Sequence, residues 1–231
     1  MYYGDSSRIL QSAALQQKQK KVQLIFTSPP FPLNTKKRYG NLKGEQYIEW
    51  FAAYAPILKR LLKANGSIVV EIGNSWEPQR PVMSTVVLRA LLRFLERGGL
   101  QLCQEFVWYN PARLPSPVQW VNVERIRVKD AFTRIWWMAV TDRPKADNRQ
   151  ILREYSESMK QLIKSGKYNA GRRPSHHNIG KKSFASNNNG AIPPNVIGGA
   201  EAQTIRSTID AKIEQLTFSN LLKSTNTHSV E

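Results

Sequence analysis

The residues best suited to chemistry lie in the run Thr27-Ser28-Pro29-Pro30-Phe31, which directly follows a short apolar segment. The Ser28 hydroxyl and a backbone carbonyl near Pro29 offer hydrogen-bond acceptors for an amine. Two successive prolines stiffen the loop and remove two N–H donors that would compete there. The Phe31 ring can stack on a base turned out of a duplex. This run therefore predicts a loop that can hold the exocyclic amine of a base.

The segments that surround this loop predict alternating strands and helices. Residues 22–26 form an apolar, β-branched run that ends at the prolines, as a buried strand leading into a functional loop does. Apolar residues recur every three or four positions over residues 45–63 and 84–97, which predicts two amphipathic helices. The first helix is expected to end in a left-handed cap at Asn65-Gly66, and the second to stop at Gly98-Gly99.

Three further apolar runs, at residues 67–72, 102–109 and 133–140, are expected to be strands of the same sheet. Because strands alternate with helices along the chain, the predicted fold class is α/β with a sheet of parallel strands. In such a sheet, ligands bind outside the carboxyl ends of the strands, which is where Ser28 falls. This position favours a binding loop over an ordinary turn or linker.

The chain is predicted to contain one main domain and two less regular parts. Residues 1–142 would form the α/β domain, residues 143–197 a basic region, and residues 198–231 a C-terminal tail. Within the basic region, residues 149–165 are expected to be helical, and residues 169–194, rich in Gly, Asn, Ser and Pro, to form a long loop. An amphipathic stretch at residues 202–223 is a candidate for a last helix.

The charge of the chain is strongly positive. The sequence holds 34 Lys and Arg against 17 Asp and Glu, which gives a formal charge of +17 and an isoelectric point near 10.2. Eleven of the basic residues, against three acidic ones, fall between Arg143 and Lys182. Such an excess favours a polyanionic partner, because neutralised phosphates release counterions. On charge alone, a ribosomal protein or a merely soluble basic protein is an equal alternative.

Several classes of site and location are disfavoured. Cys103 is the only cysteine, which excludes an intramolecular disulfide and a thiolate metal cluster. His176 and His177 have no carboxylate or cysteine at ligand spacing, so no metal is expected. The first residues do not resemble a signal peptide, and no apolar run approaches the ~18 residues of a membrane span. We therefore expect an intracellular, cytoplasmic protein without a membrane partner.

Several segments, taken in order, resemble a known enzyme family. They are Gly4-Asp5, residues 24–31, residues 66–73 and Val107-Trp108-Tyr109-Asn110-Pro111, followed by residues 114–117, 120–122, 125–130 and 192–195. Together they resemble the bacterial cytosine-N4-specific DNA methyltransferases, in the beta group of amino-methyltransferases, whose catalytic motif precedes the SAM-binding motif. The resemblance covers about residues 2–197. It implies part of a Rossmann-like, SAM-dependent methyltransferase sheet with helices on both faces, and a loop-rich target-recognition region.

The resemblance also implies roles for individual residues. The catalytic loop, which would bind the N4 amine of a flipped-out cytosine, would consist of Ser28, Pro29, Pro30 and Phe31, and SAM would be the methyl donor. Asp5 would match the acidic residue near the adenine of SAM, although a helix cap explains it nearly as well. The target-base pocket would be lined in part by Tyr109, Asn110 and Pro111.

The resemblance further implies that the basic region recognises double-stranded DNA, as in a restriction-modification system. Residues that would contact phosphates or bases are Arg125, Arg127, Lys129, Arg172, Arg173, Lys181 and Lys182. Any one of these is more often a phosphate contact or a solvated charge than a reader of bases.

The chain departs from the family pattern after Ile197. A His-Pro-Ala-type segment and a Phe-x-Gly-x-Gly loop that holds the methionine end of SAM should follow, and neither is present; Gly198-Gly199-Ala200 is better interpreted as a turn. In the family, the strand before that loop pairs with the strand before the catalytic loop. Residues 22–26 are therefore expected to form an unpaired apolar edge. Three outcomes are compatible with the missing segment. A second chain supplies the missing half, the chain forms a homodimer through the gap, or the chain is a remnant that no longer binds SAM.

Parts of the same sequence are also compatible with other functions. Adenine-N6 methylation is the nearest rival, because the same loop can hold either amine; an Asp in place of Ser28 would have favoured it. Cytosine-C5 methylation requires a cysteine nucleophile, usually after a proline, and Cys103 follows Leu102. A DNA-binding protein without catalysis is an alternative from another class, because the basic region is present while the SAM loop is not. A generic RNA-binding protein is a third option, without a recognisable motif.

Overall fold

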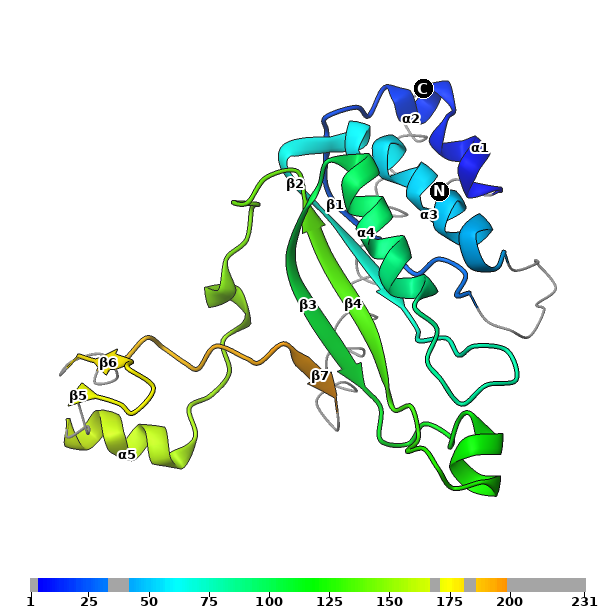
Figure 1. Cartoon of the computed structure of the whole chain (residues 1–231). Helices are drawn as coiled ribbons and strands as arrows, with labels where there is room; N and C mark the ends of the chain where they lie inside the picture. The colour runs from blue at the N-terminus through cyan, green and yellow to red at the C-terminus, as the bar shows by residue number, and fades with distance from the viewer. Residues whose placement is uncertain (1–3, 33–41, 167–170, 181–185, 199–231) are drawn as a thin grey trace, which may run out of the picture. The chain divides into compact units, whose positions relative to one another are not determined.

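The computed structural model describes residues 4–32, 42–166, 171–180 and 186–198 (Figure 1). The chain divides into two compact units. The first unit comprises the described residues of Met1–Lys145 and Asn195–Glu231, and the second comprises those of Ala146–Pro194. Within the described ranges, no helix combines the length and the apolar character that crossing a bilayer requires. The predicted domain bounds at residues 142 and 197 stay predictions.

The first unit contains a five-stranded mixed sheet. Its strands, in spatial order, are β1 (Val22–Thr27), β2 (Leu62–Ile72), β4 (Phe132–Ala139), β3 (Gln101–Tyr109) and β7 (Val196–Gly198). The β1–β2 and β3–β7 pairs are parallel, whereas β4 is antiparallel to both of its neighbours. The prediction of a parallel sheet is therefore wrong for β4. Residues 110–131 contain one π-helical turn, η1 (Gln119–Val123), and lack the crossover helix that would return the chain to a parallel start.

Helices of the first unit pack on one face of this sheet (Figure 1). They are α3 (Gly44–Leu61) and α4 (Val86–Gly98), with the short α1 (Ser6–Leu10) and α2 (Ala13–Gln16) beside them. The Phe51 and Phe94 rings stack between α3 and α4, with centroids 4.6 Å apart. The core is completed by alternate residues of two central strands, Ile68, Val70, Ile72, Trp136 and Met138. The described residues of this unit thus supply one of the two expected helical layers.

The two predicted helix ends have different outcomes. Gly99 has a φ of 53° and caps α4 in the left-handed conformation, as predicted. The predicted cap at Asn65-Gly66 is wrong, because α3 ends at Leu61 and β2 begins at Leu62. Gly66 serves a different purpose there: a Cβ at this position would lie 3.1 Å from the carbonyl oxygen of Val22. The glycine therefore allows the close approach of β1 and β2.

The second unit is small and irregular. It contains a 3-10 turn, η2 (Asn148–Ile151), the helix α5 (Glu157–Ser165) and a hairpin of β5 (Gly171–Arg172) and β6 (Asn178–Ile179). The helix predicted over residues 149–165 begins later than expected, because the Ser156 side chain caps it by accepting from the Met159 N–H at 3.3 Å. The hairpin lies within residues predicted to be loop. The stretch at residues 202–223 lies outside the described residues.

Candidate active site

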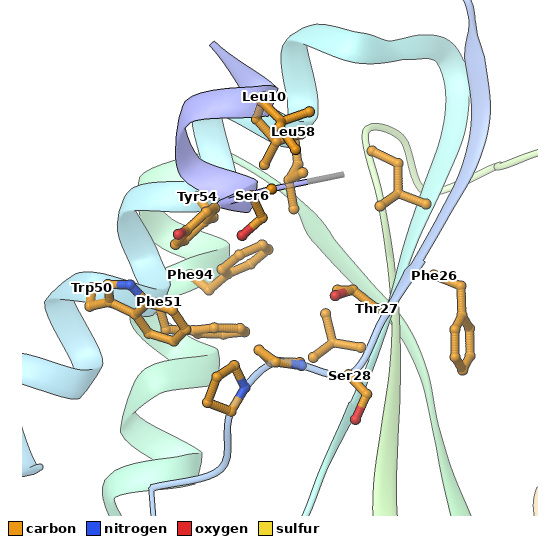
Figure 2. Close-up of a pocket in the computed structure, with 16 residues that line it drawn as sticks. Ser6, Leu10, Phe26, Thr27, Ser28, Trp50, Phe51, Tyr54, Leu58 and Phe94 are labelled. Atoms are coloured by element: carbon orange, nitrogen blue, oxygen red, sulfur yellow. The ribbon is translucent and has the colours of Figure 1, made fainter. Parts of the chain in front are cut away.

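The loop that was predicted to hold an amine follows β1 at the carboxyl end of that strand (Figure 2). Among the described strands, β1 pairs with β2 alone and forms an edge of the sheet, as expected. Ser28 and Pro30 are exposed, whereas Pro29 and Phe31 are partly buried. The hydroxyl and the adjoining backbone are therefore accessible to a ligand.

Two contacts fix the far side of this loop. The Tyr47 hydroxyl, on α3, donates a hydrogen bond to the carbonyl oxygen of Pro30 at 3.0 Å. The Phe31 ring packs against Gly73, at the carboxyl end of β2; a Cβ at Gly73 would lie 2.7 Å from Cδ2 and Cε2 of that ring. A side chain larger than glycine would displace the ring. Phe31 thus anchors the loop, and its partly exposed ring keeps some surface for contact with a base.

A cavity of about 470 Å³ opens beside the loop. Its walls come from α1, β1, the loop itself, α3 and α4, and they are mostly apolar and aromatic (Figure 2). The aromatic part of the lining consists of Trp50, Phe51, Tyr54 and Phe94. The Thr27 side chain points from β1 towards these rings, while Phe26 points to the opposite face of the sheet. Ser28 lines the cavity, so a ligand within it would lie beside the loop that was predicted to hold an amine.

Asp5 lies next to this cavity, between the lining residues Gly4 and Ser6. It is the N-cap of α1, and its Oδ1 accepts from the Arg8 N–H at 3.1 Å and from the Ser7 hydroxyl. The hydrogen bond from Ser7 contributes most, and together the two hydrogen bonds lower the pKa of the Asp5 carboxyl below its ordinary value. The helix cap is therefore present, and the exposed carboxylate lies between two residues that line the cavity.

The Tyr109-Asn110-Pro111 segment follows the carboxyl end of β3, which lies at the same end of the sheet as the carboxyl end of β1. Tyr109 is 44% exposed. The Asn110 N–H donates to the Ala131 carbonyl at 2.8 Å, and its side-chain oxygen accepts from the Ala112 N–H at 3.1 Å. The Pro111 carbonyl accepts from Lys129 Nζ at 2.7 Å. The segment is thus held as an ordered turn that presents the Tyr109 ring to solvent.

A polar network that sequence reasoning missed joins the carboxyl end of β2 and the middle of β3 to the first half of β4. Asn74 donates to Asp130 at 3.0 Å and accepts from Arg134 Nε at 3.3 Å. Arg134 also forms a partly buried ion pair with Glu105 at 2.6 Å, and the Trp136 indole N–H donates to the same carboxylate at 3.1 Å. Gly73-Asn74 directly after an apolar strand was the available signal, because that is the strand end where ligands bind.

The predicted DNA-contacting residues of the first unit differ in their surroundings. Arg125 is exposed and has a φ of 57°. Arg127 Nε donates to the Pro81 carbonyl at 2.9 Å, and Lys129 bonds the Pro111 carbonyl. Arg127 therefore also ties residues 110–131 to the segment before α4, and Lys129 ties two parts of residues 110–131 to each other. In the second unit, Arg172 and Arg173 are exposed or partly exposed on the β5–β6 hairpin, with Arg172 in contact with His176 Nδ1 at 2.6 Å. Lys181 and Lys182 lie outside the described residues.

The comparisons with known proteins agree with this geometry. A family model for DNA methylases that act on N6 or N4 matches residues 22–204. The type II methyltransferase M.PvuII of Proteus hauseri is 42% identical over 199 residues, which cover 85% of this chain and 58% of that protein. A solved structure of PvuII DNA methyltransferase, described as cytosine-N4-specific, matches with a TM-score of 0.61 and 34% identity over 86% of this chain and 56% of that one. The chain thus spans little more than half the length of these relatives.

Proposed function

The chain belongs to the N6/N4 DNA methylase family, and on this premise we propose that it carries the catalytic loop of a DNA methyltransferase specific for cytosine N4. The substrate would be a cytosine flipped out of double-stranded DNA, in a restriction-modification system, and SAM would supply the methyl group. The observation that carries the proposal is the exposed Ser28 on a proline-stiffened loop, at the carboxyl end of β1 and at the edge of an aromatic cavity.

The chemistry that this loop has to perform is the activation of a weak nucleophile. The N4 lone pair of cytosine is delocalised into the ring, and acceptors placed at the amine hydrogens localise it on nitrogen. Ser28 Oγ and a carbonyl near Pro29 are such acceptors. With a methyl group supplied by bound SAM, the amine would gain that group and would lose one proton to solvent, while Ser28 holds the amine in place. Serine stays neutral and acts by orientation, so no covalent nucleophile is needed.

The residues present fit one end of SAM. When bound, SAM supplies a methyl group on a positively charged sulfur. The aromatic walls of the cavity suit an adenine ring, and Asp5, between two of its lining residues, suits the exocyclic amine of that ring. Within the described ranges, no glycine-rich loop follows an apolar strand to hold the methionine end. We assign that end to a second chain or to a partner copy paired along the β1 edge.

Two alternatives to cytosine-N4 methylation have support. The family also contains enzymes that act on adenine N6, and the same loop can hold that amine. A DNA-binding chain without catalysis is the second candidate function, supported by the charge of +17 and by the incomplete set of SAM contacts. Binding of SAM discriminates between catalysis and DNA binding alone, and the identity of the methylated nucleoside discriminates between cytosine and adenine.

The test replaces Ser28 with Ala and measures methyl transfer to duplex DNA. The variant should lose roughly 100-fold or more of the rate, by analogy with the loss of one oriented hydrogen-bonding group in other active sites, and should still bind DNA. Ser158→Ala removes an exposed hydroxyl from α5 and is the matched control. Mass spectrometry of the digested DNA should find N4-methylcytosine. Full activity of Ser28→Ala would refute the assignment, and N6-methyladenine would establish the alternative substrate.

A parallel calorimetric titration of the chain with SAM, with and without DNA, tests the cofactor. Stoichiometric binding would support catalysis by this chain. An absence of binding with intact, salt-sensitive DNA binding would support the non-catalytic alternative, unless a complementing chain restores the affinity for SAM.

A further inference from the structure

Tyr47 connects the first turn of α3 to the amine-binding loop. Its hydroxyl donates to the Pro30 carbonyl oxygen at 3.0 Å, and the side chain is 1% exposed. This hydrogen bond joins residues 17 positions apart, between an otherwise apolar helix face and the backbone of the loop. The contact is therefore a specific attachment of the loop to the core.

The position of Tyr47 is well determined by its neighbours. Its ring stacks on Phe51, with an interplanar angle of 3° and centroids 6.2 Å apart, and it meets Trp50 at 5.6 Å. Burial raises the pKa of Tyr47 above the ordinary value of a phenol. The hydroxyl therefore holds its proton more tightly than an ordinary phenol does, and it acts as a hydrogen-bond donor.

This hydrogen bond controls the torsion that the prolines leave free. The pyrrolidine rings fix φ at positions 29 and 30, but they do not fix ψ. The carbonyl oxygen of Pro30 rotates with ψ of that residue, and the Tyr47 hydroxyl holds it in one direction. On the next residue, the Phe31 ring is held against Gly73. The loop thus has two proline rings, one hydrogen bond and one ring contact as consecutive constraints.

We propose that Tyr47 is a positioning residue for methyl transfer, because its hydrogen bond to Pro30 sets the direction of the loop carbonyls and of Ser28 towards the amine. The proposal rests on the proposed function. An amine acceptor displaced by a fraction of an ångström no longer meets the amine hydrogens in the reactive geometry, and small displacements of this kind slow a reaction by roughly 10- to 100-fold.

The first measurement reports on the loop without requiring catalysis. One Hα of Gly73 points at the Phe31 ring, so ring currents should shift its NMR resonance away from the ordinary glycine position. The full chain, labelled at its 13 glycines, is compared with Tyr47→Phe, and Phe31→Leu identifies the resonance. Tyr47→Phe should move the Gly73 signal towards the ordinary position. An unchanged signal would overturn the proposal.

Ser67→Ala is the matched control. It also removes one hydroxyl from a buried hydrogen bond, the one that Ser67 Oγ accepts from the Trp137 indole N–H at 2.9 Å. Ser67 lies in the first half of β2, away from the strand end that meets the loop. Its thermal unfolding should change about as much as that of Tyr47→Phe, while its Gly73 signal and its activity should stay as in the unchanged chain.

The second measurement is the steady-state kinetics of methyl transfer by the active assembly. Tyr47→Phe should lower kcat by roughly 10- to 100-fold and leave KM for DNA unchanged, because the loop holds the amine and not the duplex. An unchanged kcat, or an effect on KM alone, would overturn the positioning role. If the Gly73 signal moves but the unchanged protein transfers no methyl group, the attachment of the loop holds and the proposed function fails.

Discussion

Of the two roles that the sequence left open for Asp5, the structure shows the helix cap, and the contact with the adenine of SAM stays a prediction. Its Oδ1 caps α1 through Arg8 and Ser7, and the same residue lies between two residues that line the aromatic cavity. Capping requires only an oxygen acceptor, which Asn also provides. Recognition of an adenine amine is stronger with a charged acceptor. The two roles can therefore be separated by substitution.

Asp5→Asn should keep α1 and weaken the binding of S-adenosylhomocysteine by about tenfold, because the charged acceptor is lost while the cap remains. Calorimetry on the cofactor-binding assembly gives the affinity, and Asp5→Ala, which removes both functions, serves as the comparison. Equal affinities for the unchanged protein and Asp5→Asn would leave the residue with a capping role alone.

Single residues of the site were predictable where local sequence carries the signal, and not where contacts cross the fold. Ser28 stands out because a strand, two prolines and an aromatic residue adjoin it, and the structure places it at the predicted strand end. In the sequence, Tyr47 is indistinguishable from the other apolar positions of an amphipathic helix. Its hydrogen bond to Pro30 depends on how α3 packs on the sheet, which no local pattern contains. The same reason hid the Asn74–Arg134 contact.

At the scale of elements, the edge strand β1 exposes two large apolar side chains to solvent. Leu24 is 57% and Phe26 is 62% exposed, on the face opposite α3 and α4. An apolar edge strand with unpaired backbone groups is a template for association with another chain. The isolated chain is therefore expected to self-associate through β1 unless another segment covers that strand.

Leu24→Lys should reduce the self-association of the chain, because a charge on an edge strand opposes strand pairing. Sedimentation velocity at increasing protein concentration measures the effect. Leu92→Lys is the matched control: Leu92 is 65% exposed, but it lies on α4 and away from any strand edge. Equal association of both variants and the unchanged chain would show that β1 is not the contact.

Apolar runs and periodic spacing predicted that most of the strands and helices exist. They did not predict the direction of every strand or the residues at which each element begins and ends. The apolar run at residues 67–72 and the three- to four-residue spacing in α3 and α4 are local signals, and they predicted elements that the structure contains. The direction of β4 depends on the connection before it, which lacks a helix. The family resemblance is confirmed by the match over residues 22–204, because it draws on many segments together.

At the scale of the whole molecule, charge is the dominant feature. The formal charge of +17 is accompanied by a basic second unit whose hairpin carries Arg172 and Arg173. Binding of a polyanion through such residues is driven by counterion release and weakens steeply with salt. The salt dependence of DNA binding should therefore report how many of these cations meet phosphates.

Replacing Arg172 and Arg173 together with Gln should lower the magnitude of the slope of log K against log salt by about 2, if both contact phosphates. Fluorescence anisotropy with a labelled duplex at several salt concentrations gives the slope. Lys160→Gln is the control, because Lys160 is paired with Glu154 and Glu157 at 2.7 Å each. An unchanged slope in the double variant would place the hairpin away from the DNA backbone.

The second unit is an insertion whose two ends return to one sheet. Before it, the Lys145 N–H bonds the Asn65 carbonyl at 3.0 Å. After it, Asn195 bonds the backbone of Glu105 and Val107 at 2.8 and 2.9 Å. Everything between these two anchors can lengthen, shorten or be exchanged for another sequence while the strands keep their register. If the second unit reads the DNA target, as proposed, a change of sequence within this one segment would change the target while the sheet and the loop after β1 stay as they are.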